Sequence, residues 1–410
     1  MGSVRPVSVD LRTRTDSTQV ETDVAVLLEE TIPAALAASA DRLGPAWRPD
    51  LAPLVIDVEG ERRLLSLEGG VPLLEPVTRS IDRAVLHLTT QQLADLVVDQ
   101  CTPISWLADG SLRIDGGGLA LVLDWWLILR AALDGTVPHT AGAIDFVDLD
   151  GRPLDLHRSF TLDDPIEERA HFLHQAGFLH LRGVFDESEM AAVSVDMDRE
   201  APGYTKGDGR SWWAVLADGS DALVRMQAFD LRSEATARVI EDERLTEIGD
   251  LTGDGHHLPT GRGRCEGLFK PLGVRQGISD IPWHKDCSLG RHSFDCCSLT
   301  VGVSVTGADA DSGQLRVVAG SNRALMWPAP SVQPDLDLPI IDLPTRTGDL
   351  TVHCSCTLHM AQPPVTRPRR VLYTSLVMDA LDSEASAAAR ARRNAIREAA
   401  PLTVSQPAAG

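Results

Sequence analysis

The chain has 410 residues, of which 43% are hydrophobic and 24% charged, and its formal net charge is −21. This length predicts two domains, or one large domain with an annex. No run approaches the roughly 18 apolar residues that cross a bilayer, and the polar start lacks a signal peptide's apolar core, so we expect a soluble cytoplasmic protein without a membrane span. The acidic charge repels a phosphate backbone and argues against nucleic acid as a partner.

The seven cysteines are few for this length and odd in number, and six of them lie at or after Cys265. A protein with a disulfide framework usually has many cysteines for its length and an even number of them. We therefore expect these cysteines to be thiols in a reducing compartment. Cys354 and Cys356 could form part of a soft-metal site, but no second CxxC pair accompanies them, which favours buried thiols.

The first third of the chain predicts a leader and an α+β domain. Residues 1–22 are polar without apolar periodicity, which is typical of a flexible leader. Within residues 23–140, strand-like patterns at 54–58 and 63–67 lie between helical patterns, the last of them an apolar helix over 119–133.

The element order in this part, most clearly from Leu88 to Leu123, resembles the sterol-carrier-type (SCP2-like) lipid-binding domain. The resemblance implies an apolar tunnel, lined here by Trp106, Trp125 and Trp126. A filled core or an interdomain face is the alternative for these tryptophans.

Glycine and proline residues interrupt the pattern between about 136 and 155 and predict a domain boundary there. Residues 155–382 begin with helical patterns and continue as many short strands, which predicts a double-sheet barrel of the jelly-roll kind. Residues 383–410 predict a C-terminal helix, rich in Ala and Arg, followed by a loose tail.

His284 and Asp286 are two residues apart, so on an extended strand both side chains point to the same face, where one ion can bind both. His359 comes from the end of a later strand-like segment. Two histidines and one carboxylate leave three positions open on a metal, the arrangement suited to iron(II) oxygenases. His353, six residues before His359, is interpreted as a packed strand histidine rather than a ligand.

Arginines follow the late histidine and directly precede an apolar strand. A guanidinium there can bind the second carboxylate of a co-substrate in bidentate fashion. Counting from His359 favours Arg370, whereas aligning the following strand favours Arg369, which we prefer. Only one of the two can face the pocket on an extended strand.

Residues from about 166 to 380 resemble the phytanoyl-CoA dioxygenase (PhyH) family of Fe(II)/2-oxoglutarate-dependent oxygenases. The resemblance implies a double-stranded β-helix (jelly-roll, cupin-like) oxygenase domain with flanking helices, and Fe(II), 2-oxoglutarate and O2 as cofactors and co-substrates. It also implies His284, Asp286 and His359 as iron ligands and an arginine on 2-oxoglutarate. The segments that carry it are 176–185 (AGFLHLRGVF), 283–286 (WHKD), 312–321 (SGQLRVVAGS), Leu358-His359 and Arg369-Arg370.

The implied activity is hydroxylation of an unactivated C–H bond in a small apolar substrate, such as a lipid, a terpenoid or another natural product, with release of succinate and CO2. Desaturation, cyclisation or epoxidation would use the same site. Trp213 and Trp283 are candidate walls of the substrate pocket. The alternatives are a non-catalytic lipid-binding or scaffold protein, and a cupin-type metal-dependent hydrolase or isomerase. The sequence predicts neither the substrate nor the oligomeric state.

Overall fold

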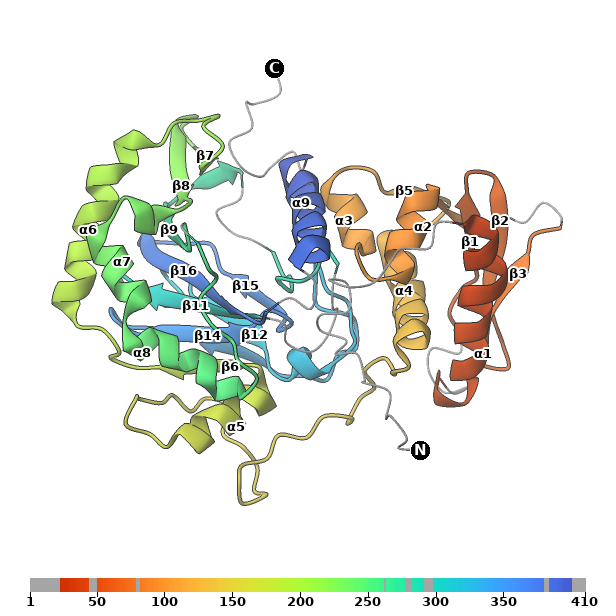
Figure 1. Cartoon of the computed structure of the whole chain (residues 1–410), viewed down its shortest axis with the longest axis horizontal. Coiled ribbons are helices and arrows are strands. Elements are labelled where there is room, and N and C mark those ends of the chain that lie inside the picture. Colours follow the sequence, from red (N-terminus) through yellow and green to blue (C-terminus); the bar gives the residue numbers. More distant parts are fainter. Residues whose placement is uncertain are drawn as a thin grey trace, which may run out of the picture.

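The computed structural model describes residues 23–43, 50–78, 82–261, 263–277, 282–290, 298–379 and 383–399. Two domains lie side by side, the first in red and orange and the second in green and blue (Figure 1). The expected leader at 1–22 and the tail at 400–410 lie outside the described residues. Among the described helices, none has both the length and the apolar character needed to cross a membrane.

The first domain is a five-stranded sheet with helices packed on it. β1 and β4 pair in parallel at its centre, and the other neighbours are antiparallel. In spatial order the strands are β3 (Val71–Pro76), β2 (Glu61–Glu68), β1 (Leu54–Val58), β4 (Ala84–Leu88) and β5 (Arg113–Asp115). The helices are η2 (Val26–Thr31), α1 (Ile32–Leu43), α2 (Thr90–Val97), α3 (Pro103–Ala108) and α4 (Leu119–Asp134).

Strand periodicity explains how this sheet buries one face. Alternate residues of β1 and β4 enter the domain core, among them Leu54, Ile56 and Leu86, because successive side chains of a strand point to opposite faces. Helix α4 is buried almost throughout, which is typical of a helix packed on two sides. Its second side meets Leu325 and Trp327 of the other domain.

The space between the sheet and α4 is a core rather than an open tunnel. Trp106, Trp125 and Trp126 are all buried there, each no more than 3% exposed. The remaining cavity between Trp125, Trp126 and the sheet measures about 10 Å³, which is at the lower limit for a single water molecule. The described conformation therefore matches the filled-core alternative for these tryptophans and has no room for a lipid.

The second domain contains two antiparallel sheets, as the sequence predicted for a jelly roll. The major sheet has eight strands, in the order β10 (Val274–Gln276), β7 (Ser211–Leu216), β8 (Asp221–Met226), β9 (Cys265–Lys270), β16 (Arg369–Val377), β11 (Ser298–Ser304), β14 (Leu350–Cys354) and β6 (Phe178–Leu181). The minor sheet has three, β13 (Ile340–Leu343), β12 (Leu315–Val318) and β15 (His359–Ala361).

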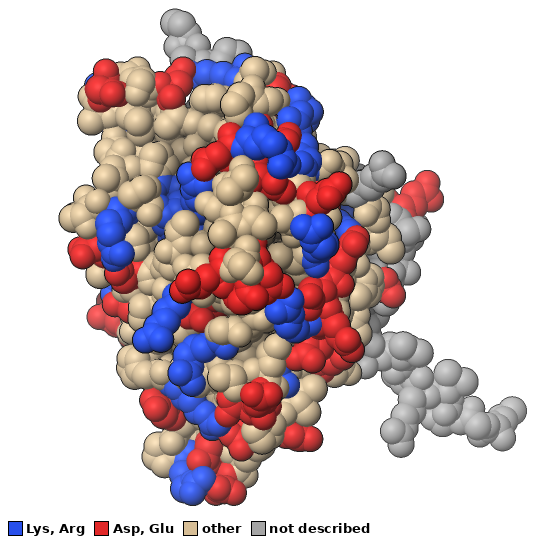
Figure 2. Space-filling view, turned by 90° about the vertical axis from the view of Figure 1, so that its left-hand side faces the viewer, with Lys and Arg blue, Asp and Glu red and all other residues tan. Residues whose placement is uncertain are grey.

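Helices cover the outer side of the major sheet (Figure 1). They are α5 (Ile166–Ala176), α6 (Glu187–Glu200), α7 (Glu234–Glu241) and α8 (Glu243–Thr246), with short turns η3 (Ala201–Gly203), η4 (Phe229–Leu231) and η5 (Glu247–Thr252). The turn η6 (Ser321–Arg323) instead follows β12 of the minor sheet. Figure 2 looks onto this side of the molecule and shows acidic and basic side chains interspersed. Ion pairs such as Arg244 with Glu189 account for part of that mixture.

The predicted C-terminal helix is present as α9 (Ser383–Ala399), and it lies against α3 of the first domain. Ile396 enters the first domain's core, and Arg392 pairs with Asp95. Helix α9, which follows the second domain in sequence, thus packs on the first domain.

Candidate metal centre and co-substrate site

Two short segments from distant parts of the chain carry the three predicted metal ligands. His284 and His359 exchange backbone hydrogen bonds of 2.9 Å in both directions. Next to this bridge, the amide of Asp286 donates to the carbonyl of Ser355 at 2.8 Å. Backbone pairing therefore brings all three side chains to one place at the edge of the minor sheet.

The donor atoms of these side chains suit a single ion. Oδ1 of Asp286 lies 3.7 Å from Nε2 of His284 and 3.7 Å from Nε2 of His359. One ligand atom from each of the three lies within 4.8 Å of the others. Two imidazoles and one carboxylate on one side of a metal leave the opposite side open, as iron(II) oxygenases require.

The backbone fixes which imidazole nitrogen faces the metal position. Nδ1 of His284 lies 2.7 Å from the carbonyl of Pro282, and Nδ1 of His359 lies 2.9 Å from the carbonyl of Thr357. A carbonyl only accepts, so each Nδ1 carries the proton and each Nε2 keeps its lone pair for a metal. The residues present thus fit an iron(II) ion.

The electrostatics agree with that assignment. Burial, together with the neighbouring His353 and His284, holds the pKa of His359 well below its usual value, and burial likewise lowers the pKa of His284. Burial alone would raise the pKa of Asp286, but His359, His353 and His284 outweigh it and lower that pKa strongly. At neutral pH the histidines are neutral and the aspartate is ionised, the states in which these groups bind metals.

The second carboxylate oxygen of Asp286 has its own partners. Thr300 donates its hydroxyl to Oδ2 at 2.6 Å, and Nε2 of His353 lies 3.4 Å from the same oxygen. Thr300 and His353 face each other across β11 and β14. His353 is 1% exposed, and its ring lies 4.1 Å from that of His359. Sequence reasoning placed His353 on a strand but missed that this strand faces the metal.

The structure places the two candidate arginines on opposite faces of β16. Arg369 is 5% exposed, and its guanidinium donates to the carbonyl of Gly313 and, at 3.3 Å, to the hydroxyl of Tyr373. Arg370 points outward and pairs with Asp198 of α6 at 2.7 Å. Only Arg369 lies between the two sheets, on the side where a co-substrate would bind.

A second cation accompanies Arg369. Lys270 is directly opposite it on β9 and is 2% exposed. Its ammonium donates to the carbonyl of Gln362 at 2.9 Å. Two buried cations side by side favour a carboxylate ligand between the sheets.

The two tryptophans predicted as walls of a substrate pocket have different surroundings. Trp283 is partly buried and packs against the small core that contains Val318, Met326 and Leu358, because neighbouring residues of an extended segment point in opposite directions and His284 takes the metal side. Trp213 donates to Ser211 of its own strand. A role in a substrate pocket remains a prediction for both.

Trp212, the neighbour of Trp213, packs against Arg225. The guanidinium of Arg225 stacks over its ring, 4.3 Å from the ring centroid, and also pairs with Glu266 at 3.0 Å. The charge of Arg225 contributes to the lowered pKa of His284, although less than burial does. Arg225 thus acts electrostatically on the metal centre.

The first domain contacts the segment that follows Asp286. Thr102 and Ser105, at the start of α3, donate their hydroxyls to the carbonyls of Ser288 and Leu289. A Cβ on Gly290 would lie 2.1 Å from the carbonyl oxygen of Gln100, so only glycine fits there. No sequence pattern indicated that these two domains meet beside a metal ligand.

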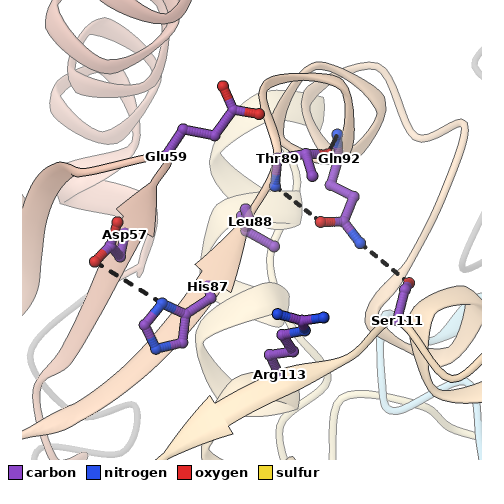
Figure 3. Close-up of a pocket in the computed structure, with 8 residues that line it drawn as sticks. All are labelled: Asp57, Glu59, His87, Leu88, Thr89, Gln92, Ser111 and Arg113. Atoms are coloured by element: carbon purple, nitrogen blue, oxygen red, sulfur yellow. Dashed lines mark hydrogen bonds and ion pairs between the residues drawn. The ribbon is translucent and has the colours of Figure 1, made fainter.

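A separate hollow lies on the first domain. It measures about 370 Å³ (Figure 3). Across it, Gln92 bonds Thr89 and Ser111, and His87 lies 3.8 Å from Asp57 and 2.9 Å from Asp115. Its polar side chains are held by one another, and it is separate from the metal centre.

The geometry above, with two histidines, one aspartate and a buried arginine in a jelly roll, defines a non-haem iron oxygenase type of site. Residues 173–371, slightly under half of the chain, match the family model described as phytanoyl-CoA dioxygenase (PhyH). This part of the second domain is thus similar to that family. A comparison with curated proteins found no match.

Several solved structures are similar to this chain. One is the epimerase SnoN in complex with Fe3+, alpha ketoglutarate and nogalamycin RO, at 19% identity over 52% of this chain and 83% of that one, with a TM-score of 0.40. Another is EctD from S. alaskensis with 2-oxoglutarate and 5-hydroxyectoine, at 18% identity over 59% and 86%, with a TM-score of 0.42. A third is the non-heme alpha ketoglutarate dependent carbocyclase SnoK from nogalamycin biosynthesis, at 18% identity over 57% and 93%, with a TM-score of 0.41.

Proposed function

We propose that this protein is an iron(II)- and 2-oxoglutarate-dependent dioxygenase that hydroxylates an unactivated C–H bond of a small organic substrate. The observation that carries the proposal is the position of Oδ1 of Asp286, 3.7 Å from Nε2 of both His284 and His359. Bound iron(II) would supply the oxidising chemistry, in which O2 and 2-oxoglutarate are consumed, succinate and CO2 are released and one oxygen atom enters the substrate.

The protein's own residues hold and orient the reactants. His284, Asp286 and His359 bind the metal on one side and leave the other side open for 2-oxoglutarate and O2. Arg369 pairs with the far carboxylate of 2-oxoglutarate, and Lys270 adds a second positive charge beside it. Both cations are buried, so water is excluded from their ion pairs with the carboxylate, and the electrostatic attraction in these pairs is stronger.

The surroundings of the metal also bear on the substrate. Trp212 offers a flat apolar surface, and the guanidinium of Arg225 above it offers hydrogen-bond donors and a positive charge. We therefore propose a small substrate with an apolar body and an acceptor or anionic group that reaches Arg225. The polar group is an addition to the small apolar substrate, such as a lipid, a terpenoid or another natural product, that the sequence led us to expect.

The two alternative functions account for less of the site. A non-catalytic binding protein has no need of neutral histidines and an ionised aspartate turned toward one point. A cupin-type hydrolase or isomerase shares the metal ligands but has no need of the buried guanidinium of Arg369. Both alternatives therefore leave a buried and costly charge unexplained.

Succinate formation tests the proposal. The full-length chain is supplied with iron(II), ascorbate, O2 and 2-oxoglutarate, with and without pools of small aromatic and aliphatic acids, and succinate is measured. We expect iron-dependent succinate that Asp286→Ala abolishes, and that Asp342→Ala, an exposed aspartate paired with Arg316 on the minor sheet, retains. Succinate no higher than in the Asp286→Ala variant would contradict the proposal.

A further inference from the structure

The two segments that carry the metal ligands also carry a pair of cysteines. Cys287 directly follows Asp286, and Cys356 lies three residues before His359. Both cysteines lie in turns beside the backbone bridge between His284 and His359, Cys287 in the turn that begins at Asp286 and Cys356 in the turn between β14 and β15. The two segments that build the metal centre thus also bring the two cysteines together.

Their sulfur atoms are in contact. Sγ of Cys287 lies 3.5 Å from Sγ of Cys356, and both residues are thiols. No other atom need move between two sulfurs that already touch, so the approach of the two segments is the only change that a disulfide requires. The chain therefore holds these thiols close enough to react with each other.

The two thiols differ in access. Cys356 is 0% exposed, whereas Cys287 is partly exposed. Among the cysteines that the structure describes, the others, Cys101, Cys265 and Cys354, are all buried. A small oxidant from solvent can thus reach Cys287 first, with Cys356 already beside it to complete a disulfide, the arrangement found in thiol pairs that respond to oxidants.

We propose that Cys287 and Cys356 form a redox modification site, oxidised to a disulfide by a hydroperoxide. In the first step the sulfur of Cys287 attacks hydrogen peroxide, the O–O bond breaks, and Cys287 becomes a sulfenic acid as one water leaves. In the second step the sulfur of Cys356 attacks the sulfenic sulfur, the S–S bond forms, the S–O bond breaks, and the second water leaves with the proton of Cys356. Two electrons pass from the sulfurs to one peroxide.

The bond acts on the neighbouring metal centre. A disulfide has an S–S length of about 2.05 Å, so the sulfurs must approach each other from 3.5 Å and draw the two segments together. Asp286 and His359 belong to these segments, so their metal-binding atoms would be displaced. A metal site tolerates little displacement of its ligands. We expect the oxidised form to bind iron(II) about tenfold more weakly, an effect within the range seen when groups supporting metal ligands are altered. This consequence rests on the proposed iron site, whereas formation of the disulfide does not.

The test uses the full-length, metal-free chain treated with hydrogen peroxide, followed by blocking of remaining thiols and mass spectrometry of its peptides. We expect a peptide pair joined through Cys287 and Cys356 that dithiothreitol separates. Cys287→Ser and Cys356→Ser should lose the cross-link, and Cys101→Ser, at a buried thiol of the first domain, should keep it. Peroxide that leaves the pair unjoined in folded protein, or joins either cysteine elsewhere, overturns the proposal.

Iron(II) binding to the reduced and oxidised forms is then compared by anaerobic competition with a coloured chelator. Weaker binding by the oxidised form, restored by dithiothreitol, supports control of the metal centre, and equal binding by both forms overturns that control. Failure of the reduced form to bind iron(II) would instead count against the proposed function, because the cross-link is detected without metal.

Discussion

Thr300 donates its hydroxyl to Oδ2 of Asp286 at 2.6 Å, and this leaves Oδ1 directed at the Nε2 atoms of both histidines. Partners of a metal ligand's second atom orient the ligand, and their loss typically costs 10- to 100-fold in metal affinity. We predict that Thr300→Val, which keeps the shape of the side chain and removes the hydroxyl, weakens iron(II) binding by roughly tenfold or more.

Anaerobic competition with a coloured chelator measures this affinity. Thr300→Ser retains the hydroxyl and is the matched control, which should bind iron(II) nearly as the native protein does. Equal affinities for the valine and serine variants would show that the hydrogen bond does not orient Asp286.

Substitution of the two adjacent arginines of β16 should have different effects, on 2-oxoglutarate binding for Arg369 and on stability for Arg370. Arg369→Ala removes a buried cation beside Lys270, and we predict 2-oxoglutarate binding about 100-fold weaker, equivalent to roughly 3 kcal/mol for a hydrogen-bonded charge. Arg370→Ala removes the contacts to Ser194 and Asp198 on α6, so it should change unfolding free energy by about 1 kcal/mol and leave 2-oxoglutarate affinity unchanged. Calorimetric titration with 2-oxoglutarate and urea unfolding measure the two effects, and loss of 2-oxoglutarate binding in Arg370→Ala alone would reverse our assignment.

The hydroxyl of Thr102 both caps α3 and bonds Ser288 of the other domain. Thr89 caps α2 with the same kind of capping box but on an exposed surface. We predict that Thr89→Ala lowers the unfolding free energy by about 1 kcal/mol through the lost cap, whereas Thr102→Ala lowers it by about 2 to 3 kcal/mol because a buried carbonyl also loses its donor. Urea unfolding measures both. Equal losses would mean that the interdomain bond contributes nothing.

Asp349, 3% exposed, directly precedes β14 and bonds His180 and Gly183, in and after the neighbouring strand β6. Burial opposes its ionisation, but hydrogen bonds from His180 and from the amides of Arg346 and Gly183 outweigh burial and lower its pKa. A lowered folded-state pKa contributes stability that is present above the unfolded value, about 3.9, and is lost as the pH falls through the folded value.

We therefore predict that Asp349→Asn destabilises the protein by about 2 kcal/mol at pH 7, the scale of a buried group that loses charged hydrogen bonds. The difference from the native protein should shrink as the pH falls from 5 toward 2. Urea unfolding at several pH values measures this difference, with the exposed Asp342→Asn as control. A difference that stays constant down to pH 2 would contradict the role of the ionised form.

Much of the fold was predictable because its elements follow local rules. The apolar periodicity and flanking glycine of residues 166–176 correspond to α5, whose last residue precedes Gly177 with φ +80°. The helix predicted at 383–399 is confirmed in its extent by α9. The convergence of His284, Asp286 and His359 agrees with the prediction from their spacing on extended segments.

Other parts depend on contacts between residues far apart in sequence. The contact between His353 and Asp286 could not be predicted from sequence, because it needs β14 to lie beside β11. Neither the hydroxyl contacts of α3 with Ser288 nor the sulfur contact of Cys287 with Cys356 leaves a sequence pattern. The choice between Arg369 and Arg370 likewise needed the register of β16 against β9.

Anaerobic addition of iron(II) and 2-oxoglutarate to the metal-free protein tests the central claim most directly, through the weak visible charge-transfer band of the chelate. The account predicts that the band appears in the native protein and in Arg370→Ala, and is absent from His284→Ala and Arg369→Ala. Folded native protein that shows no band and binds no 2-oxoglutarate would contradict the account and favour a binding protein or a cupin-type enzyme.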